Sequence, residues 1–542
     1  MLIVVRTLNS SARLTSRKAG LVSVYTQTAS TGDLRRTLSS STATTPTTAP
    51  TGEELAIGYF EQFSSYKEMV EDAKRRARRS ILIDNCNLDS IHVREELWDS
   101  IEHLYRIKKT STRGTSKLSL VELKSEACAN ELVRDATHNE GHIPIPMKVL
   151  RYYNRHGSPV KSQNLPFPVT DVTLKFNRES APHIDSISAL ISNNMMTLTG
   201  LKLRFITLVN IEDAVCSGPF REYELLPFGS SVIHTGYDSG DLDLVFSRKA
   251  RRRQTKSNHN ELVHLDKSIS LDYKSNIGNR DAMDYLTLLM RDFLPIAESS
   301  SVIPIYRARV PIIKFTSRVT DIDCDMSFNL GLDASKTTHG GILMTEIFYT
   351  LCKQNNLVTA VMIFLKVFAK LAGITSKGSS SVMSNFQFQS LVLYFLQVEK
   401  LVPPLKDVYR TETQRVKLDD EELCQKLPRL VERFSRFYTS FDFANTAMNL
   451  NDARTERKLD NSPLYIKYPF EANKNICKTV HRKGLEHFRR NIRLLRDDPS
   501  ELMKTLLISE NAKNLRSLER SKVMNLDSPF ISQETIAKEV CS

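Results

Sequence analysis

The pattern of apolar and polar positions in the first third of the chain predicts a small α+β domain. A charged helix is expected over residues 54–78, followed by a strand at Ser80–Asp84, a helix at Ile91–Tyr105, alternation near Leu118–Leu123, a helix near Glu126–Ala136 and a strand near Pro146–Tyr152. This β-α-β-β-α-β-like order suits a ferredoxin-like or RNA-recognition-like domain over residues 55–155. The segment lacks the RNP1 pattern with its stacking aromatics, which argues against RNA binding by this domain.

The periodicity of the remaining chain indicates a mixed segment and then a helical one. A helix-rich stretch over residues 181–217 precedes the strand-like run that begins at Tyr223. Beyond residue 340 the pattern is mainly helical, with helices expected at Ile342–Cys352, Leu357–Leu371, Phe386–Lys400, Leu418–Tyr438 and Gly484–Arg496. Residues 501–542 form a polar C-terminal tail.

The first 45 residues have the composition of a targeting segment followed by a linker. No acidic residue occurs from Met1 to Gly32, whereas arginine and lysine recur among serine, threonine and small apolar residues. This composition is typical of a mitochondrial presequence, and an ordinary disordered tail is the alternative. The Ser/Thr/Pro-rich run Leu38–Thr51 is expected to be a flexible linker.

Composition narrows the class of protein without defining it. Hydrophobic and charged fractions of 41% and 25% are ordinary for a soluble globular protein, but the net charge of +13 favours a polyanionic partner such as nucleic acid. The eight cysteines contain no CxxC pair, which argues against a structural zinc site or a disulfide framework. The longest apolar stretch, Leu357–Leu371, is interrupted by two lysines, so no membrane span is expected.

The strongest chemical signal is a glycine-serine turn followed by two aspartates. Gly229-Ser230 precedes Asp241-Leu242-Asp243, and alternation in a strand places the two carboxylates on one face. Paired carboxylates repel each other unless a cation neutralises them, and oxygen ligands suit Mg²⁺ or Mn²⁺. Gly229 lets the backbone of the turn approach a phosphate. Solubilising aspartates at exposed strand ends are the alternative interpretation.

A second alternating strand supplies a partner carboxylate. The run Asp321–Asn329 places polar residues, including Asp323 and Asp325, on one face and apolar residues on the other. Three carboxylates in one cleft can hold two metal ions, one activating a 3′-hydroxyl and the other stabilising a departing pyrophosphate. The pattern leaves Asp321, Asp323 and Asp325 open as the third ligand.

The Gly229-Ser230 and Asp241-x-Asp243 arrangement resembles the DNA polymerase β-type nucleotidyltransferase superfamily. It is most similar to the branch of poly(A) polymerases and terminal uridylyltransferases, with matching segments from about Leu201 to Val480. The resemblance implies an α+β fold: a nucleotidyltransferase palm with a mixed sheet over residues 185–335 and a helical, PAP-associated domain over residues 336–500. By this likeness Asp241, Asp243 and Asp325 are the catalytic, metal-binding residues.

The helical segment carries the candidates for nucleotide binding. Lys366 and Lys370 are spaced i, i+4 on an otherwise apolar helix, where surface lysines with half-buried stems are the alternative reading. In the resembled family lysines at this spacing contact the nucleotide phosphates. Ser384-Asn385-Phe386 matches a triplet whose aromatic ring stacks on the incoming base.

Two departures from the family pattern bear on specificity. Relatives that add uridylate often have a histidine where this chain has Lys474, which favours adenylate. Gly340-Gly341 replaces an Asn-Thr pair that lies near the sugar in many relatives. The expected function is template-independent addition of adenylate from ATP to RNA 3′ ends in the mitochondrial matrix. The alternatives are uridylyl or mixed addition and, in a different class, an inactive RNA-binding scaffold.

Two basic runs and the subunit arrangement complete the expectations. Residues 74–79 read either as a solvated helix face or as a binding site, with the solvated face favoured, and residues 248–253 read as a solvated loop or as a contact with the RNA backbone. No individual residue is assigned to RNA. Relatives pair through their RNA-recognition-like domain, so a homodimer is implied by resemblance.

Overall fold

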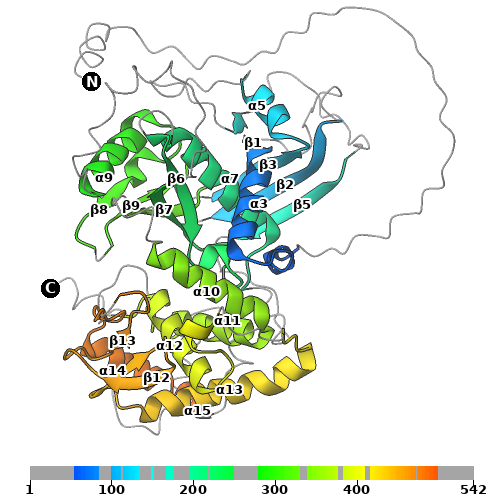
Figure 1. The fold of residues 1–542 in the computed structure, drawn as a ribbon. Helices are drawn as coiled ribbons and strands as arrows, with labels where there is room; N and C mark the ends of the chain where they lie inside the picture. Colours follow the sequence, from blue (N-terminus) through cyan, green and yellow to red (C-terminus); the bar gives the residue numbers. More distant parts are fainter. Residues whose placement is uncertain are drawn as a thin grey trace, which may run out of the picture.

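The computed structural model describes residues 54–84, 99–111, 114–134, 148–151, 167–175, 194–216, 220–249, 279–308, 310–329, 339–375, 382–408, 415–471 and 473–497. The predicted presequence and linker, the C-terminal tail and residues 250–253 of the second basic run lie outside these ranges. The described part forms an upper half, made of an N-terminal sheet and a second sheet side by side, and a helical lower half (Figure 1).

The N-terminal sheet has the strand order β4-β1-β3-β2-β5. Its strands and its helix are β1 (Ser80–Asp84), β2 (Ile101–Ser111), β3 (Gly114–Leu123), α5 (Glu126–Arg134), β4 (Val149–Arg151) and β5 (Val169–Lys175). The β1 strand pairs antiparallel with β3, as in the antiparallel sheet of an RNA-recognition-like domain, but it pairs parallel with β4, which departs from that fold. The sheet extends beyond residue 155, because β5 adds a fifth strand parallel to β2.

The expected helix at Ile91–Tyr105 is wrong at its C-terminal end. Residues 91–98 lie outside the described ranges, and residues 101–105 belong to β2. The cause is the two-residue alternation of this run: Leu104 packs with the cluster beneath α5, whereas Tyr105 and Ile107 pack in the main core. This alternation suits a strand that contributes apolar side chains to the cores on both faces of a sheet. A helix with a single apolar stripe would contribute to one core only.

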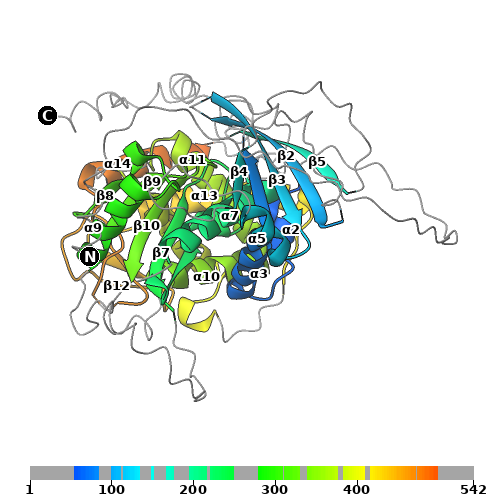
Figure 2. The same ribbon diagram turned by 90° about the horizontal axis from the view of Figure 1, so that it is seen from above.

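Both faces of the N-terminal sheet are covered. One face packs on α5 through a small core that includes Ile81, Val121 and Val133. The opposite face, which includes Leu82 and Leu120, belongs to the main core, together with α3 (Tyr66–Arg78) and α7 (Leu198–Val215). Figure 2 shows α3 and α7 between the two sheets. Base stacking on this face, as in RNA-binding relatives of the fold, is therefore blocked.

The second sheet, in the palm segment, has the order β6-β7-β10-β9-β8. Its strands are β6 (Tyr223–Phe228), β7 (Leu242–Arg248), β8 (Ile303–Ile305), β9 (Ile312–Thr316) and β10 (Asp323–Asn329), with α9 (Asn279–Leu288) and the π-turn η4 (Leu289–Phe293) beside them. The β7 and β10 strands are parallel and the other pairs antiparallel, so the sheet is mixed, as predicted. Short 3₁₀ turns, η3 (Ser230–Val232) and η5 (Ser299–Ser301), connect the strands.

The lower half contains the helices that periodicity predicted. They are α10 (Gly340–Gln354), α11 (Asn356–Leu371), α12 (Asn385–Val398) and α13 (Asp420–Ser440), and the single helix expected at Gly484–Arg496 is divided into α14 (Arg482–Asn491) and α15 (Leu494–Asp497). A small sheet, β12-β11-β13 (Arg454–Arg457, Thr446–Asn449, Ile466–Lys467), and the turn η6 (Leu405–Asp407) were not foreseen. The short helix α2 (Ala56–Phe60) precedes α3, and together they replace the single helix expected over residues 54–78. None of the helices in the described ranges has the length and apolarity of a membrane span.

Candidate active site

The centre of the palm sheet brings two of the predicted carboxylates together. Asp243 on β7 and Asp325 on β10 are register partners on adjacent parallel strands, so their side chains leave the same face of the sheet. The buried residues between and beside them, Leu242, Leu244 and Cys324, point to the opposite face and anchor both strands in the core. Asp241 lies just before β7, on the Asp243 side of the alternation.

The electrostatics of Asp243 are those of a crowded carboxyl group. Burial, together with the charges of Asp325 and Asp241, raises its pKa to about 8 against the lowering effect of Lys314 and Lys366. Gly229 lies directly against this carboxylate and has a positive φ of 81°; a Cβ atom on Gly229 would overlap the Oδ2 atom of Asp243. The glycine is therefore required both by its backbone conformation and by the close approach of Asp243.

Lys314 is a member of the site that the sequence analysis missed. It lies opposite Asp325 in the β9–β10 pairing, and its Nζ atom is 2.9 Å from Oδ1 of Asp325. The available signal was a single lysine in the apolar run Ile312–Thr316. The two neighbouring aspartates make other contacts: Asp323 accepts a hydrogen bond from Thr316, and Asp321 forms an ion pair with Lys109. Of the three candidates, Asp325 is the one placed beside Asp243.

A buried arginine holds the loop that leads into the Asp241-x-Asp243 strand. Arg204 on α7 has no exposed surface, and its guanidinium donates hydrogen bonds to the carbonyl oxygens of Gly200, Tyr237, Asp238 and Gly240 at 2.6–3.3 Å. Three of these four carbonyls lie within the last four residues before Asp241. The arginine therefore sets the start of the strand, a role that its position in an apolar helix did not reveal.

The two predicted lysines of α11 lie beside the palm through Tyr237. The Nζ atom of Lys366 donates to the carbonyl of Thr235 at 2.8 Å and lies 4.3 Å from the centre of the Tyr237 ring. The Nζ atom of Lys370 lies 5.8 Å from the same ring and its side chain is exposed. Both lysines line a pocket with Asn385, at the junction of the palm and the helical half. The snorkelling alternative is wrong for Lys366, which is only 6% exposed.

The triplet at the start of α12 divides into a structural and an accessible part. Ser384 is the N-cap: its hydroxyl accepts from the backbone N–H of Gln387, whose side chain bonds back in a capping box. Asn385 lines the pocket that also contains Lys366. Phe386 is 39% exposed, so its ring is accessible for stacking.

The Gly340-Gly341 departure has a structural counterpart. The hydroxyl of Tyr468 lies where a side chain on Gly340 would begin, and the ring of Phe228 fills the same space at Gly341. Lys474, the residue found in place of the histidine, lies with its Nζ atom 5.1 Å from the Tyr468 ring centre. The missing side chains at positions 340 and 341 are thus replaced by aromatic groups from β6 and from the segment after β13.

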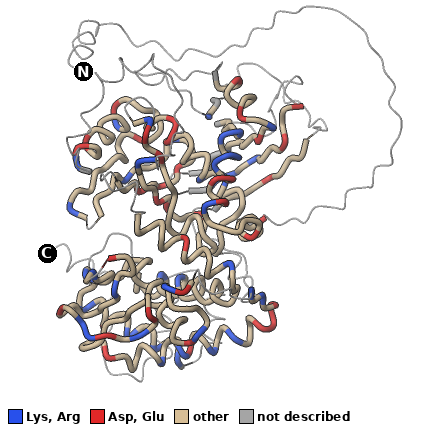
Figure 3. The backbone as a smooth tube through the Cα atoms, in the orientation of Figure 1, with Lys and Arg blue, Asp and Glu red and all other residues tan. Residues whose placement is uncertain are grey.

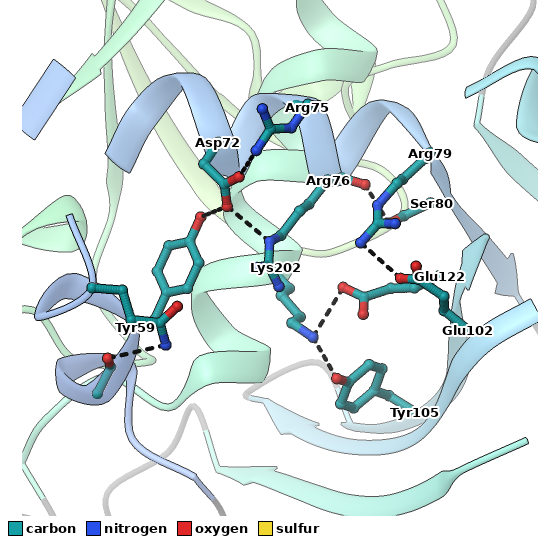
Figure 4. A network of polar contacts seen from close by, with 12 residues as sticks. Tyr59, Asp72, Arg75, Arg76, Arg79, Ser80, Glu102, Tyr105, Glu122 and Lys202 are labelled. Carbon is teal, nitrogen blue, oxygen red and sulfur yellow. Dashed lines mark hydrogen bonds and ion pairs between the residues drawn. The ribbon is translucent and has the colours of Figure 1, made fainter. Parts of the chain in front are cut away.

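The basic run of residues 74–79 binds acidic partners within the chain. Lys74 and Arg78 both pair with the nearly buried Glu212 on α7 at 2.8 Å, and Arg79 pairs with Glu102 on β2. Arg75 and Arg76 pair with Asp72 (Figure 4). Lysines and arginines are spread over both halves of the molecule (Figure 3). The preference for a solvated face holds for Arg75, which is exposed, but it is wrong for Lys74 and Arg78, which join α3 to α7.

The carboxylates are suited to a divalent cation without forming a finished metal site. Within the described ranges, no three acidic, histidine or cysteine side chains are grouped closely enough to hold a metal ion as they stand. Burial and the neighbouring charges of Asp325 and Asp241 nevertheless raise the pKa of Asp243, and a cation bound between these carboxylates would offset both effects. The donor set consists of carboxylate oxygens, which suit Mg²⁺ or Mn²⁺.

Comparison with known proteins agrees with this geometry. Residues 184–339 match the family model described as the central palm domain of mitochondrial-like poly(A) RNA polymerase. The mitochondrial poly(A) RNA polymerase of Homo sapiens is 24% identical over 328 residues, and that of Drosophila melanogaster is 26% identical over 347 residues. The matches cover 56% and 58% of this chain and 53% of each relative, so the chain spans about half the length of these relatives.

Solved structures show the same fold over most of the chain. A crystal structure of mtPAP in its apo form matches 82% of this chain and 100% of its own, with a TM-score of 0.66 and 20% identity. A crystal structure of mtPAP in complex with ATPγS has the same coverage and identity and a TM-score of 0.62. The predicted α+β fold, with its nucleotidyltransferase palm and helical domain, is confirmed.

Proposed function

We propose that this chain, whose residues 184–339 belong to the mitochondrial-like poly(A) RNA polymerase palm family, adds adenylate from ATP to RNA 3′ ends without a template. The observation that carries the proposal is the in-register pair Asp243 and Asp325 on adjacent strands, where burial and the neighbouring carboxylates raise the pKa of Asp243 to about 8. A scaffold protein has no need for such a pair, because crowded carboxylates reduce stability.

In this reaction the 3′-hydroxyl oxygen of RNA attacks the α-phosphorus of ATP, and the bond to the bridging oxygen of pyrophosphate breaks. Asp241, Asp243 and Asp325 would hold Mg²⁺ or Mn²⁺, which lowers the pKa of the 3′-hydroxyl and neutralises the departing pyrophosphate. Gly229 and Ser230 form the turn that lies against the carboxylate of Asp243, and the backbone of this turn would approach the phosphates of ATP. The hydroxyl proton passes to solvent, and pyrophosphate is the leaving group.

The helical half would bind the nucleotide. Lys366 and Lys370 add positive charge beside the palm, and the exposed Lys370 is the better placed of the two to reach a triphosphate. Asn385 lines the same pocket, Ser384 caps the helix that carries it, and Phe386 presents a ring for stacking on the base. Stacking alone does not select a base, since every base has a flat face.

The test is an extension assay on a short RNA primer with magnesium and each nucleoside triphosphate in turn. We expect extension with ATP and little with UTP, CTP or GTP. Preference for UTP would overturn the base assignment and support uridylyl addition. Absence of extension with every nucleotide, unchanged by Asp241→Ala, would support the scaffold alternative.

Removing one lysine of the helical half tests nucleotide binding separately from stability. Lys370→Met is expected to raise the KM for ATP about tenfold, because an exposed ammonium within reach of the triphosphate is lost. The melting temperature and the KM for RNA should stay within experimental error. Lys426→Met, which breaks a surface pair with Glu422, is the matched control and should leave all three values unchanged. Equal effects of the two substitutions would contradict the assignment.

The cellular site and the subunit arrangement are part of the same proposal. The curated relatives are named as mitochondrial, and the acid-free composition of residues 1–32 is compatible with import. We place the activity in the mitochondrial matrix and the protein in a homodimer formed through the N-terminal domain. Import of a fluorescent fusion into mitochondria and light-scattering measurement of the molar mass test these two statements.

A further inference from the structure

We propose that Lys109, on strand β2 of the N-terminal domain, is a positioning residue for the carboxylates of the palm. Its side chain has no exposed surface. Its Nζ atom donates to the carbonyl oxygen of Thr320 at 2.5 Å and forms an ion pair with Oδ2 of Asp321 at 2.5 Å. These contacts join residues that are more than 200 positions apart in the sequence, and they cross from one sheet to the other.

The turn that Lys109 holds is the closed end of the hairpin formed by β9 and β10. One strand of this hairpin carries Lys314 and the other carries Asp325, four residues beyond Asp321. Asp321 adopts a left-handed conformation, with φ of 47°, and its N–H donates to the carbonyl of Ser317. Aspartate tolerates this conformation better than most residues but still at some cost. The tight turn is therefore stabilised by Lys109, a residue of the neighbouring N-terminal sheet.

Lys109 is an exception among the residues that share its side of β2. Tyr105 and Ile107 pack in the main core, and an apolar residue at position 109 could extend that core. A buried ammonium costs desolvation energy that its partners only offset, so it is weak evidence for stability. The ammonium group instead fixes position: it ties the turn between β9 and β10 to strand β2 of the N-terminal sheet.

The consequence for the site follows from the geometry of metal ligands. Divalent cations require oxygen ligands within narrow distance limits, and a shift well below 1 Å is enough to weaken binding. The separation of Asp243 and Asp325 depends on how β10 lies against β7. Because Lys109 holds the turn that precedes β10, the N-terminal domain contributes to the spacing of this pair without touching it.

The proposal rests on the metal-binding role in the proposed function, but its test does not require the reaction. Binding of Mn²⁺ to the full chain is measured by the electron paramagnetic resonance signal of the free ion, without RNA or ATP. Lys109→Met is expected to weaken Mn²⁺ binding at least tenfold and to lower kcat, with the KM for ATP unchanged. Lys108→Met, at the exposed neighbouring position of β2, is the matched control and should bind Mn²⁺ as the wild type does.

A second variant keeps the test decisive if Lys109→Met fails to fold. Asp321→Asn retains a residue that accepts the left-handed conformation and removes only the charge that pairs with Lys109. We expect Mn²⁺ binding to weaken about threefold in this variant. Wild-type affinity in a folded Lys109→Met or Asp321→Asn protein would overturn the proposal. Weaker Mn²⁺ binding in a chain that extends no primer would instead sustain the positioning role and reject the polymerase activity.

Discussion

Replacing Asp243 by asparagine should reduce nucleotide addition by at least about a thousandfold, the largest loss expected from any single change in this chain. The amide keeps the shape of the side chain but loses the charge that would hold a cation beside Asp325. The measurement is kcat on an RNA primer at saturating ATP and magnesium. Asp323→Asn is the control: Asp323 is exposed, accepts a hydrogen bond from Thr316, and should retain activity within about threefold.

The same substitution should have the opposite effect on stability in the metal-free protein. The native pKa of Asp243, about 8, is raised above the usual aspartate value, so the native state holds this proton over a pH range in which the unfolded state has released it. The stability due to this proton is complete below about pH 4 and is lost as pH rises through 8. Asparagine cannot ionise and avoids that loss.

We therefore expect Asp243→Asn in EDTA to exceed the wild type in unfolding free energy at pH 8 by several kcal/mol, with an upper bound of about 5 kcal/mol set by the pKa shift of Asp243. The difference should shrink as pH falls toward 4. Urea unfolding followed by circular dichroism at several pH values measures it. A variant that is less stable than the wild type at pH 8 would show that the carboxylate is not under electrostatic strain.

The part of the site that could be predicted from the sequence is the part that is local along the chain. Gly229-Ser230 and Asp241-x-Asp243 fall within fifteen residues, and strand alternation is enough to place the two carboxylates on one face. The choice among Asp321, Asp323 and Asp325 depended on resemblance. In the structure it depends on register, because Asp325 pairs with Asp243 whereas Asp321 turns toward Lys109.

The features that escaped prediction all depend on contacts between distant segments. Periodicity identified α13 and α14 because each has one buried face, whereas α11 and α12 are buried nearly all round and were identified by their long apolar runs. Periodicity failed for β2, where apolar residues lie on both faces of the strand: Leu104 faces α5, whereas Tyr105 and Ile107 face the main core. A charged run such as residues 74–79 reads as solvated until its partner, Glu212, is known to lie opposite. Sequence patterns carry no information about such pairings.

Arg204 is the residue whose loss should most reduce stability. Arg204→Met is expected to lower the unfolding free energy by about 3–5 kcal/mol, because four carbonyl groups lose their donor and one acidic neighbour loses its counterion. That neighbour is Asp238: burial raises its pKa, and the charge of Arg204 opposes the rise. The carboxylate of Asp238 also fills the space where a side chain on Gly200 would lie, so the loop and α7 have little room to adjust.

Urea unfolding of Arg204→Met measures the loss, with Arg106→Met as the control. Arg106 forms a surface ion pair with Asp171, and removing it should cost less than about 1 kcal/mol. In the double variant Arg204→Met/Asp238→Asn part of the stability should return, because the uncompensated charge is removed while the carbonyls remain without a donor. If the double variant is no more stable than the single one, the arginine acts through the carbonyls alone. In either case the loop before Asp241 loses its hydrogen bonds to Arg204. Primer extension should therefore fall together with stability, because this buried arginine positions the carboxylates of the site without contacting them.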